Sequence, residues 1–402
     1  MEIKTNTIPA IEGGKATREN FLPFSQPEIR EEDIKAVTDV LQSRWIGTGP
    51  KCKEFEDKFA EYIGAKYCVT VNSCTAALIL SLKRLSLPKD SEVITTPLTF
   101  CATVGAIIEA GYKPVLCDIN WETGCIDPNE IEKKVTKKTK AILPVHFAGY
   151  PCDMNDITII AEGYNLEIVE DCAHAIETTY HGKHAGNFGR AGCFSFYANK
   201  NLTTAEGGMI CTWNKDDAEW YKSMRSHGMT GDAWKRYSKH GYKHYLVEEL
   251  GYKCNMPDVA AALGIKQLER IEEHWNLRKR IWDIYTEELS DLPIILPAYP
   301  EEGIKSALHL YVIRIKPESI KVDRDHILTA LQKEGIGVGV HYLTVPEHPG
   351  FRNILGVGPE EYPKAFEFGR TCLSLPLSPA MKESDAYDVV AAVKKVIEYY
   401  RR

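Results

Sequence analysis

Three polar segments of the sequence each follow a β-like stretch and carry groups that could bind an anion or move a proton. The first, residues 72–75 (Asn-Ser-Cys-Thr), lies between a β-rich run and a helical pattern. Backbone amides and the positive dipole at the start of a helix can bind a phosphate group. Ser73 or Thr75 could equally be an ordinary helix N-cap, which is the more common use of such residues. This segment alone therefore leaves both interpretations open.

The other two segments add carboxylates, a histidine and a lysine. Residues 169–174 (Val-Glu-Asp-Cys-Ala-His) place Asp171 and His174 after a buried strand. A carboxylate there needs a cation or strong donors, although Asp171 also stands where a helix cap is expected. Residues 195–208 hold Lys200 in a loop of small polar residues. A lone lysine is usually solvated, whereas a desolvated lysine has a lowered pKa and can form a Schiff base.

Together, the three segments predict a binding site for pyridoxal phosphate. Lys200 would hold the aldehyde of the cofactor. Asp171 would pair with the pyridinium nitrogen and keep it protonated, so that the ring can accept electrons. The turn at 72–75 would anchor the phosphate.

The elements that must position these residues alternate in type along the first half of the chain. Strands that alternate with helices form a mostly parallel sheet with helices on both faces. In such sheets the ligand binds at the carboxyl ends of the strands. The sequence therefore predicts an α/β fold, with strands at 66–71, 91–96, 113–119, 140–147 and 166–170 and helices at 75–85 and 101–110.

The second half of the chain has a different pattern. One long helical pattern at 258–289 has a length that suits a connector between domains. We expect a large domain at 25–256 and a smaller α+β domain at 257–402, with residues 1–24 packing on the smaller domain. The further elements that we expect are strands at 192–197, 208–213, 308–315 and 336–342 and helices at 323–334 and 386–400.

Composition excludes several classes of protein. The chain has 402 residues and a formal net charge of −7, which argues against nucleic acid as a partner. No apolar run is long enough to span a membrane, and the polar start is not a secretory signal. The 12 cysteines include no CxxC pair, so we expect no metal site and a reduced, cytoplasmic protein. The glycines at 335–339 follow the pattern GxGxG rather than GxGxxG, which argues against a nicotinamide dehydrogenase.

Several blocks along nearly the whole chain resemble the DegT/DnrJ/EryC1/StrS family of sugar-nucleotide aminotransferases, which are fold type I pyridoxal-phosphate enzymes. Within the family, the spacing is most similar to the aminotransferases that make UDP-4-amino-4-deoxy-L-arabinose and to the spore-coat polysaccharide members. The matching blocks include WIGTGPKCKEFE, VNSCTAAL, TPLTFCAT, PVHFAGYPCDM, VEDCAHA, FSFYANKNLTTAEGGM and GYKCNMPDVAAALG.

The resemblance implies roles for individual residues. Lys200 matches the lysine that binds the cofactor, Asp171 its pyridinium partner, and His174 a residue beside the ring; these three would be catalytic. Asn255 matches a segment that reaches the neighbouring subunit's phosphate, which implies a homodimer with shared active sites. The other residues implied to bind cofactor are Cys74, Thr75, Phe100 and Ser195, and those implied to lie near the sugar are His341 and Tyr342.

Three positions depart from the usual pattern of the family. Cys74 stands where glycine is common in the phosphate-binding turn, and its backbone amide is retained. Cys254 and Leu308 stand where aromatic residues are frequent, which bears on sugar specificity more than on chemistry. Relatives that act as dehydratases have histidine in place of the lysine, so Lys200 argues against that branch.

The resemblance also implies the reaction. We expect transamination of a nucleotide-linked 4-keto sugar, a UDP- or dTDP-linked pentose or 6-deoxyhexose, with L-glutamate as the amino donor. The basic, aromatic run at 235–243 is a candidate contact for the nucleotide diphosphate. Two alternatives stay open: transfer to a 3-keto sugar, and a regulatory protein that binds pyridoxal phosphate without turnover.

Overall fold

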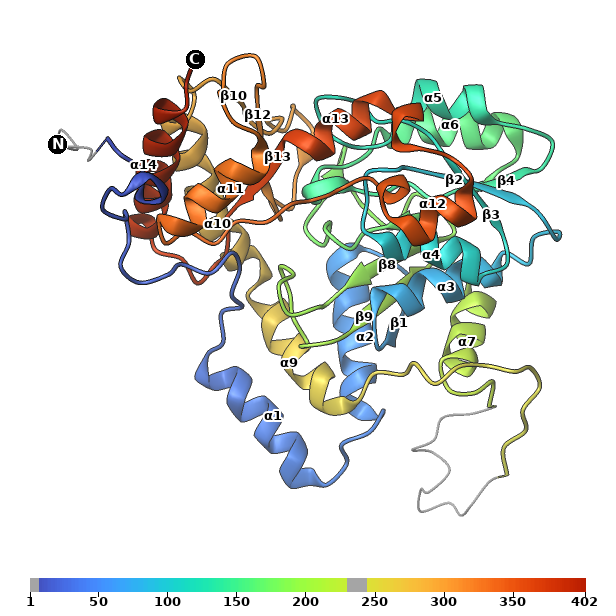
Figure 1. Ribbon diagram of the computed structural model, residues 1–402. Coiled ribbons are helices and arrows are strands. Elements are labelled where there is room, and N and C mark those ends of the chain that lie inside the picture. The colour runs from blue at the N-terminus through green and yellow to red at the C-terminus, as the bar shows by residue number, and fades with distance from the viewer. Residues whose placement is uncertain (1–6, 230–243) are drawn as a thin grey trace.

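A seven-stranded sheet forms the centre of the part of the chain that the computed structural model describes, residues 7–229 and 244–402 (Figure 1). Strand β9 is antiparallel to both of its neighbours, and every other pairing in the sheet is parallel. The predicted α/β fold with a mostly parallel sheet is confirmed. In spatial order the strands are β1 (Tyr67–Val71), β9 (Gly208–Thr212), β8 (Ala191–Ser195), β5 (Glu167–Asp171), β4 (Thr139–Ile142), β2 (Glu92–Thr95) and β3 (Lys113–Leu116).

Helices cover both faces of this sheet. Every residue of β2, β8 and β9 is buried, as expected for central strands between two helical layers. Along β8, Cys193 packs into the apolar cluster of α3, α4 and α7, whereas its neighbour Phe194 packs into the cluster of α2 and α9. The helices of this region are α1 (Glu31–Ser43), α2 (Pro50–Ile63), α3 (Cys74–Arg84), α4 (Cys101–Glu109), α5 (Pro128–Lys134), α6 (Met154–Tyr164) and α7 (Lys215–Met224).

The C-terminal part of the chain forms a second core. Its three-stranded sheet has the order β10-β12-β13, and helices α10, α11 and α14 pack against it. A further small sheet has the order β11-β6-β7. The elements are α9 (Asp258–Glu269), α10 (Ile271–Glu288), β10 (Ile294–Ile295), β11 (Ile304–Lys305), β12 (Tyr311–Ile315), α11 (Arg324–Lys333), α12 (Pro349–Leu355), α13 (Pro363–Thr371), β13 (Cys372–Leu375), α14 (Glu383–Tyr399), β6 (Thr179–Tyr180) and β7 (Lys183–His184). Short 3-10 helices lie at η1 (Ala10–Glu12), η2 (Phe147–Gly149), η3 (Val345–Glu347) and η4 (Pro359–Glu361).

Two of the predicted elements were wrong. The helical pattern at 258–289 is two helices, because Arg270 leaves the helical conformation (φ −114°, ψ 8°) and donates to the buried carboxylate of Asp33 on α1 at 2.6 Å. Helix α9 packs with α2 against the seven-stranded sheet, whereas most of the buried apolar side chains of α10 pack in the C-terminal core. The break between the two helices therefore allows each helix to pack against a different sheet. Residues 336–342 are not a strand: Ile336 and Gly339 make only isolated bridges, to Leu22 and Ser374 respectively.

The segment before α1 is joined to the C-terminal core by several contacts, among them a buried carboxylate. Glu334 accepts hydrogen bonds from the backbone amides of Ala10 and Thr17, and it pairs with Lys395 at 2.7 Å. Figure 1 shows this dark blue segment beside the red helix α14. Among the described helices, none has both the length and the apolar character needed to cross a bilayer.

Candidate active site

The carboxyl ends of β1, β2, β5 and β8 lie at one edge of the sheet, where they bring the predicted residues together. Asp171 ends β5, and its carboxylate is buried. Its Oδ2 accepts a hydrogen bond from the Thr103 hydroxyl at 2.8 Å, and its Oδ1 accepts one from the Ala173 amide at 3.1 Å. Burial raises the pKa of Asp171, while these two donors and the positive charge of Lys200 act in the opposite direction.

Lys200 follows β8 in the loop that leads to β9. Its backbone amide donates to Tyr197 at 3.0 Å, which fixes the loop at this residue. Burial lowers the pKa of its amine from 10.5 to about 8, although the charges of Cys74 and Asp171 favour the protonated amine. A larger share of Lys200 is therefore neutral near neutral pH than for an exposed lysine.

His174 is held in one tautomer beside Lys200. The backbone amide of Ala148 donates to Nδ1 at 3.2 Å, so we assign the ring proton to Nε2, which donates to the Tyr342 hydroxyl oxygen at 3.1 Å. Burial, with the nearby charge of Lys200, lowers the pKa of His174 well below its ordinary value. His341 also lies near Lys200. Its Nδ1 is hydrogen-bonded to the Ser374 hydroxyl at 2.8 Å, and burial lowers the pKa of His341 to about 4. Both imidazoles are therefore neutral near pH 7.

The predicted phosphate-binding turn is the start of an 11-residue helix. Ser73 is the N-cap of α3, and its hydroxyl accepts the Ala76 amide at 3.2 Å. Cys74 is buried, with its thiol facing the carbonyl of Cys193, whereas Thr75 is exposed. Gly208, the first residue of β9, lies so close that a Cβ there would be 2.5 Å from the Ser73 carbonyl carbon. The turn therefore presents backbone amides and a hydroxyl rather than bulky side chains.

The other residues predicted to bind the cofactor lie at the start of α4, at the end of β8 and in the segment before α9. Phe100 is the N-cap residue of α4; it is 58% exposed, and its ring is 6.2 Å from that of Tyr342. Ser195 is buried at the end of β8. Asn255 donates to Thr48 at 2.5 Å and accepts from Lys253, and no contact joins it to Lys200 within the described part of the chain. The basic run at 235–243 lies outside the described residues.

Sequence reasoning missed a buried network next to the lysine. The Asn201 side chain donates to Glu177 and to the Ala307 carbonyl, both at 2.9 Å, and accepts from Nδ1 of His309 at 3.0 Å. The ring of His309 lies 4.4 Å from that of His174. Glu177 is also paired with Arg278 of α10. The network therefore ties the lysine loop to two distant stretches of the chain.

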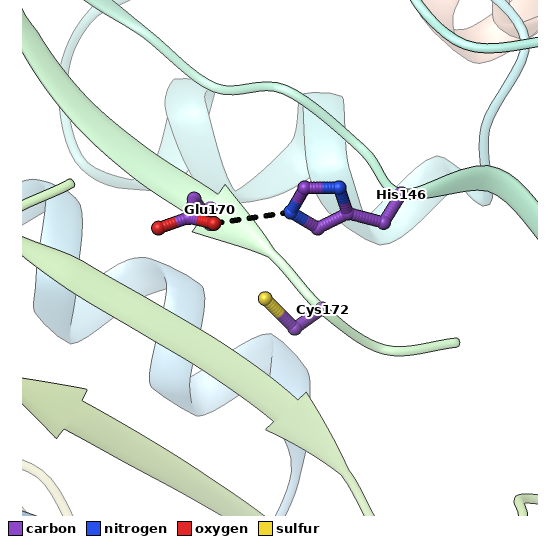
Figure 2. Close-up of side chains that lie close together, drawn as sticks. All are labelled: His146, Glu170 and Cys172. Atoms are coloured by element: carbon purple, nitrogen blue, oxygen red, sulfur yellow. Dashed lines mark hydrogen bonds and ion pairs between the residues drawn. The ribbon is translucent and has the colours of Figure 1, made fainter. Parts of the chain in front are cut away.

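A second buried cluster, His146, Glu170 and Cys172, places possible metal ligands within 4.8 Å of one another (Figure 2). The Cys152 amide donates to Nδ1 of His146. The ring proton of His146 is therefore on Nε2, which donates to the Glu170 carboxylate. The other donors to the Glu170 carboxylate are the amides of Gly186, Phe188 and Gly189.

These four donors occupy the acceptor positions of Glu170, and both ring nitrogens of His146 are already in use. Burial raises the pKa of the Cys172 thiol well above its ordinary value, which keeps it protonated. The atoms that could bind a metal are therefore engaged inside the protein, and we assign this cluster to holding the end of β5 in place.

The chain matches a family of known proteins along most of its length. Residues 27–394 match the DegT/DnrJ/EryC1/StrS aminotransferase family. The chain is 42% identical over 382 residues to the spore coat polysaccharide biosynthesis protein SpsC of Bacillus subtilis, covering 95% of this chain and 98% of SpsC.

Two solved structures share the fold along nearly their whole length. The putative sugar aminotransferase Spr1654 of Streptococcus pneumoniae, solved in PMP and PLP forms, has a TM-score of 0.88 for the PMP form at 34% identity, covering 94% of this chain and 99% of that one. PseC of Helicobacter pylori, an aminotransferase involved in the biosynthesis of pseudoaminic acid, has a TM-score of 0.88 at 30% identity, covering 94% and 100% of the two chains.

Proposed function

We propose that this chain, which belongs to the DegT/DnrJ/EryC1/StrS aminotransferase family, transfers the amino group of L-glutamate to C4 of a nucleotide-linked keto sugar. Membership makes it a pyridoxal-phosphate-dependent sugar aminotransferase. The observation that carries the reaction is the partly neutral Lys200 amine beside the buried carboxylate of Asp171. A UDP- or dTDP-linked 4-keto pentose or 6-deoxyhexose is the proposed acceptor.

The residues of the site fit the cofactor. An ionised carboxylate offers about four acceptor positions, and Thr103 and Ala173 use two of those on Asp171, which leaves room for a ring N–H. No side chain among the described residues bonds to Nζ of Lys200, so the amine is available for the cofactor aldehyde. A Cβ at Gly208 would lie 2.7 Å from the Cys74 amide nitrogen, so the glycine keeps the start of α3 open for a phosphate. Phe100 would stack on the ring, His174 would lie beside it, and Ser195 would contact the phosphate.

Pyridoxal phosphate, when bound, supplies a carbonyl that links to amines and a ring that stores an electron pair. Lys200 Nζ takes the proton from the α-carbon of L-glutamate, and in the second half of the cycle it delivers a proton to the sugar carbon that receives nitrogen. Asp171 stabilises a positive ring nitrogen. His174 remains neutral and keeps Tyr342 in place, and His341 and Tyr342 face the sugar.

A second copy of the chain would complete the site. We place Asn255 against the phosphate of the partner subunit, which makes the protein a homodimer with shared active sites. Apolar side chains exposed on α1 and just after it, Ile34, Leu41 and Ile46, support such an interface. Mixing Lys200→Ala protein with Asn255→Ala protein should then restore activity, because one site of the mixed dimer has both residues intact.

The product would enter a cell-surface polysaccharide or glycan, in keeping with the role of SpsC in spore coat polysaccharide biosynthesis. All twelve cysteines are free thiols, which supports a reducing, cytoplasmic location as part of this proposal. L-Glutamate gives up its amino group and leaves as 2-oxoglutarate.

An absorption spectrum before and after L-glutamate tests the first half of the reaction. The visible band of the lysine-bound cofactor should bleach with L-glutamate and return when a 4-keto sugar nucleotide is added. NMR of the product separates C4 from C3 transfer. If the absorbance of this band does not change with any amino donor, the result would contradict the proposal and favour a regulatory protein that binds pyridoxal phosphate without turnover.

A further inference from the structure

We propose that Thr103 is a positioning residue that orients the Asp171 carboxylate toward the ring nitrogen of the cofactor and keeps the proton on that nitrogen. The inference rests on the proposed function only in taking Asp171 as the partner of the ring. Thr103 lies on α4, 68 positions before Asp171 in the sequence, and is not part of any of the three polar segments that predict the site.

The contact between the two side chains is short and fully enclosed. Thr103 Oγ1 lies 2.8 Å from Asp171 Oδ2, and Thr103 is 1% exposed. Asp171 itself is only 4% exposed, so the hydroxyl takes the place of water that would otherwise solvate this oxygen. A hydrogen bond to a charged acceptor is stronger than one between neutral groups.

The direction of each hydrogen bond follows from a second threonine. Thr99 Oγ1 lies 2.7 Å from Thr103 Oγ1, and both hydroxyls are buried. An ionised carboxylate can only accept, so Thr103 uses its single hydrogen toward Asp171. Thr103 must then accept from Thr99, and the two hydroxyls form a relay that points toward the carboxylate. Hydrogen bonds in such a chain strengthen one another.

Helix α4 also explains why the donor comes from this position. The Thr103 amide donates to the Phe100 carbonyl at 3.1 Å, so both residues belong to the first turn of α4. The first turn of α4 therefore carries both Phe100, which would stack on the face of the cofactor ring, and Thr103, whose hydroxyl holds Asp171 beside the ring nitrogen. The other oxygen of Asp171 is fixed from its own loop, by the amide of Ala173. The carboxylate is therefore held from two independent elements.

Loss of the Thr103 hydroxyl should move a proton. The hydrogen bond favours the charged form of Asp171, so in Thr103→Val the carboxylate becomes more basic. The proton shared with the ring nitrogen then shifts toward the carboxyl group. A neutral ring nitrogen is a poorer electron sink, so proton removal from the amino donor slows.

The test uses the holoenzyme loaded with pyridoxal phosphate that carries ¹⁵N in the ring. In the wild type, the nitrogen resonance should be that of a protonated pyridine, and in Thr103→Val it should move toward the neutral position. Thr103→Ser, which keeps the hydroxyl, should restore the wild-type resonance. The rate of the half-reaction with L-glutamate should fall by about ten- to a hundredfold in Thr103→Val, the range expected for one hydrogen bond to a charged group.

Thr95→Val is the matched control, because Thr95 is equally buried at the end of β2 and its hydroxyl donates to the Leu143 carbonyl at 2.7 Å instead. A cofactor analogue with carbon in place of the ring nitrogen provides a second control, since Thr103→Val should then lose nothing relative to wild type. If Thr103→Val does not fold, Thr103→Ala is measured in the same way.

An unchanged nitrogen resonance in Thr103→Val, or an equal change in Thr95→Val, would overturn the inference. Wild-type protein that binds the labelled cofactor with a protonated ring but does not react with L-glutamate would contradict the proposed function alone. The two failures are therefore distinguishable.

Discussion

The pKa of Lys200 leads to a quantitative prediction about its reactivity. Burial lowers that pKa from 10.5 to about 8. At pH 7 a pKa of about 8 leaves about one amine in ten neutral, against about one in three thousand at the ordinary value. Lys200 should therefore react with electrophiles faster than an exposed lysine at this pH, by less than this roughly 300-fold ratio because a less basic amine is a weaker nucleophile. The advantage exists because only the neutral amine carries a lone pair.

Competitive acetylation of the cofactor-free protein measures this directly. Trace reagent is added at pH values from 6 to 11, and the modified Lys200 peptide is quantified by mass spectrometry. Labelling should rise with pH, reach half its maximum near pH 8 and level off above about pH 9, where most of the amine is neutral. The same peptide labelled in denaturant is the control, and its labelling should continue to rise to beyond pH 10. If the folded and denatured curves coincide, the desolvated environment assigned to Lys200 is wrong.

Three substitutions test other parts of the structure. Gly208→Ala should weaken cofactor binding by about tenfold or more, because the new Cβ would lie 2.5 Å from the Ser73 carbonyl carbon; absorbance titration measures it. Glu170→Gln should lower the free energy of unfolding by about 3 kcal/mol, since an amide N–H₂ would face backbone donors; urea denaturation measures it. Burial alone would raise the pKa of Glu334, but its hydrogen bonds, chiefly that to Lys395, outweigh this effect, and the net pKa is lowered from 4.5. The ionised carboxylate therefore stabilises the fold at pH values above about 4.5, and this stabilisation is lost as the pH falls below that value. Glu334→Gln should flatten the acid side of a plot of stability against pH, which urea denaturation at each pH measures.

Each substitution has a comparison that isolates its cause. Gly105→Ala in α4 should leave cofactor binding unchanged, since a Cβ there meets only Phe351 at 3.9 Å. Glu167→Gln at the start of β5 should change stability little, because its carboxylate is half-exposed. Wild-type cofactor affinity in Gly208→Ala, native stability in Glu170→Gln, or an unchanged acid profile in Glu334→Gln would each contradict the corresponding argument.

The sheet could be predicted from the sequence because its signals are local. Strands such as β2 and β8 are short segments between turn residues, and α3 begins with a serine cap. The break at Arg270 could not be predicted, since no glycine or proline marks it and its cause is an ion pair with Asp33, far away in the sequence. Residues 336–342 have a strand-like composition, yet the bridges that they make depend on which distant segments arrive beside them.

The same distinction holds for the candidate site. Lys200, Asp171 and the turn at Cys74 each lie at or just after the end of a strand. Because ligands bind at the carboxyl ends of the strands in a parallel sheet, these residues could be predicted to share one site. Thr103 carries no such signal, because a threonine in the first turn of a helix is ordinary until the fold places it 2.8 Å from a buried carboxylate. Asn201 directly follows Lys200, but its three partners lie in other parts of the chain.

The candidate site draws on widely separated stretches of the sequence, from the turn at Cys74 to Tyr342. A growing chain that has not reached Lys200 lacks the amine proposed to hold the cofactor, and one that has not reached Tyr342 lacks the hydroxyl that is bonded to His174. Non-local contacts of this kind form late in folding. Because a ligand stabilises only the state that binds it, pyridoxal phosphate would stabilise chains in which these stretches have come together. Cofactor binding would then favour folded chains over incomplete ones.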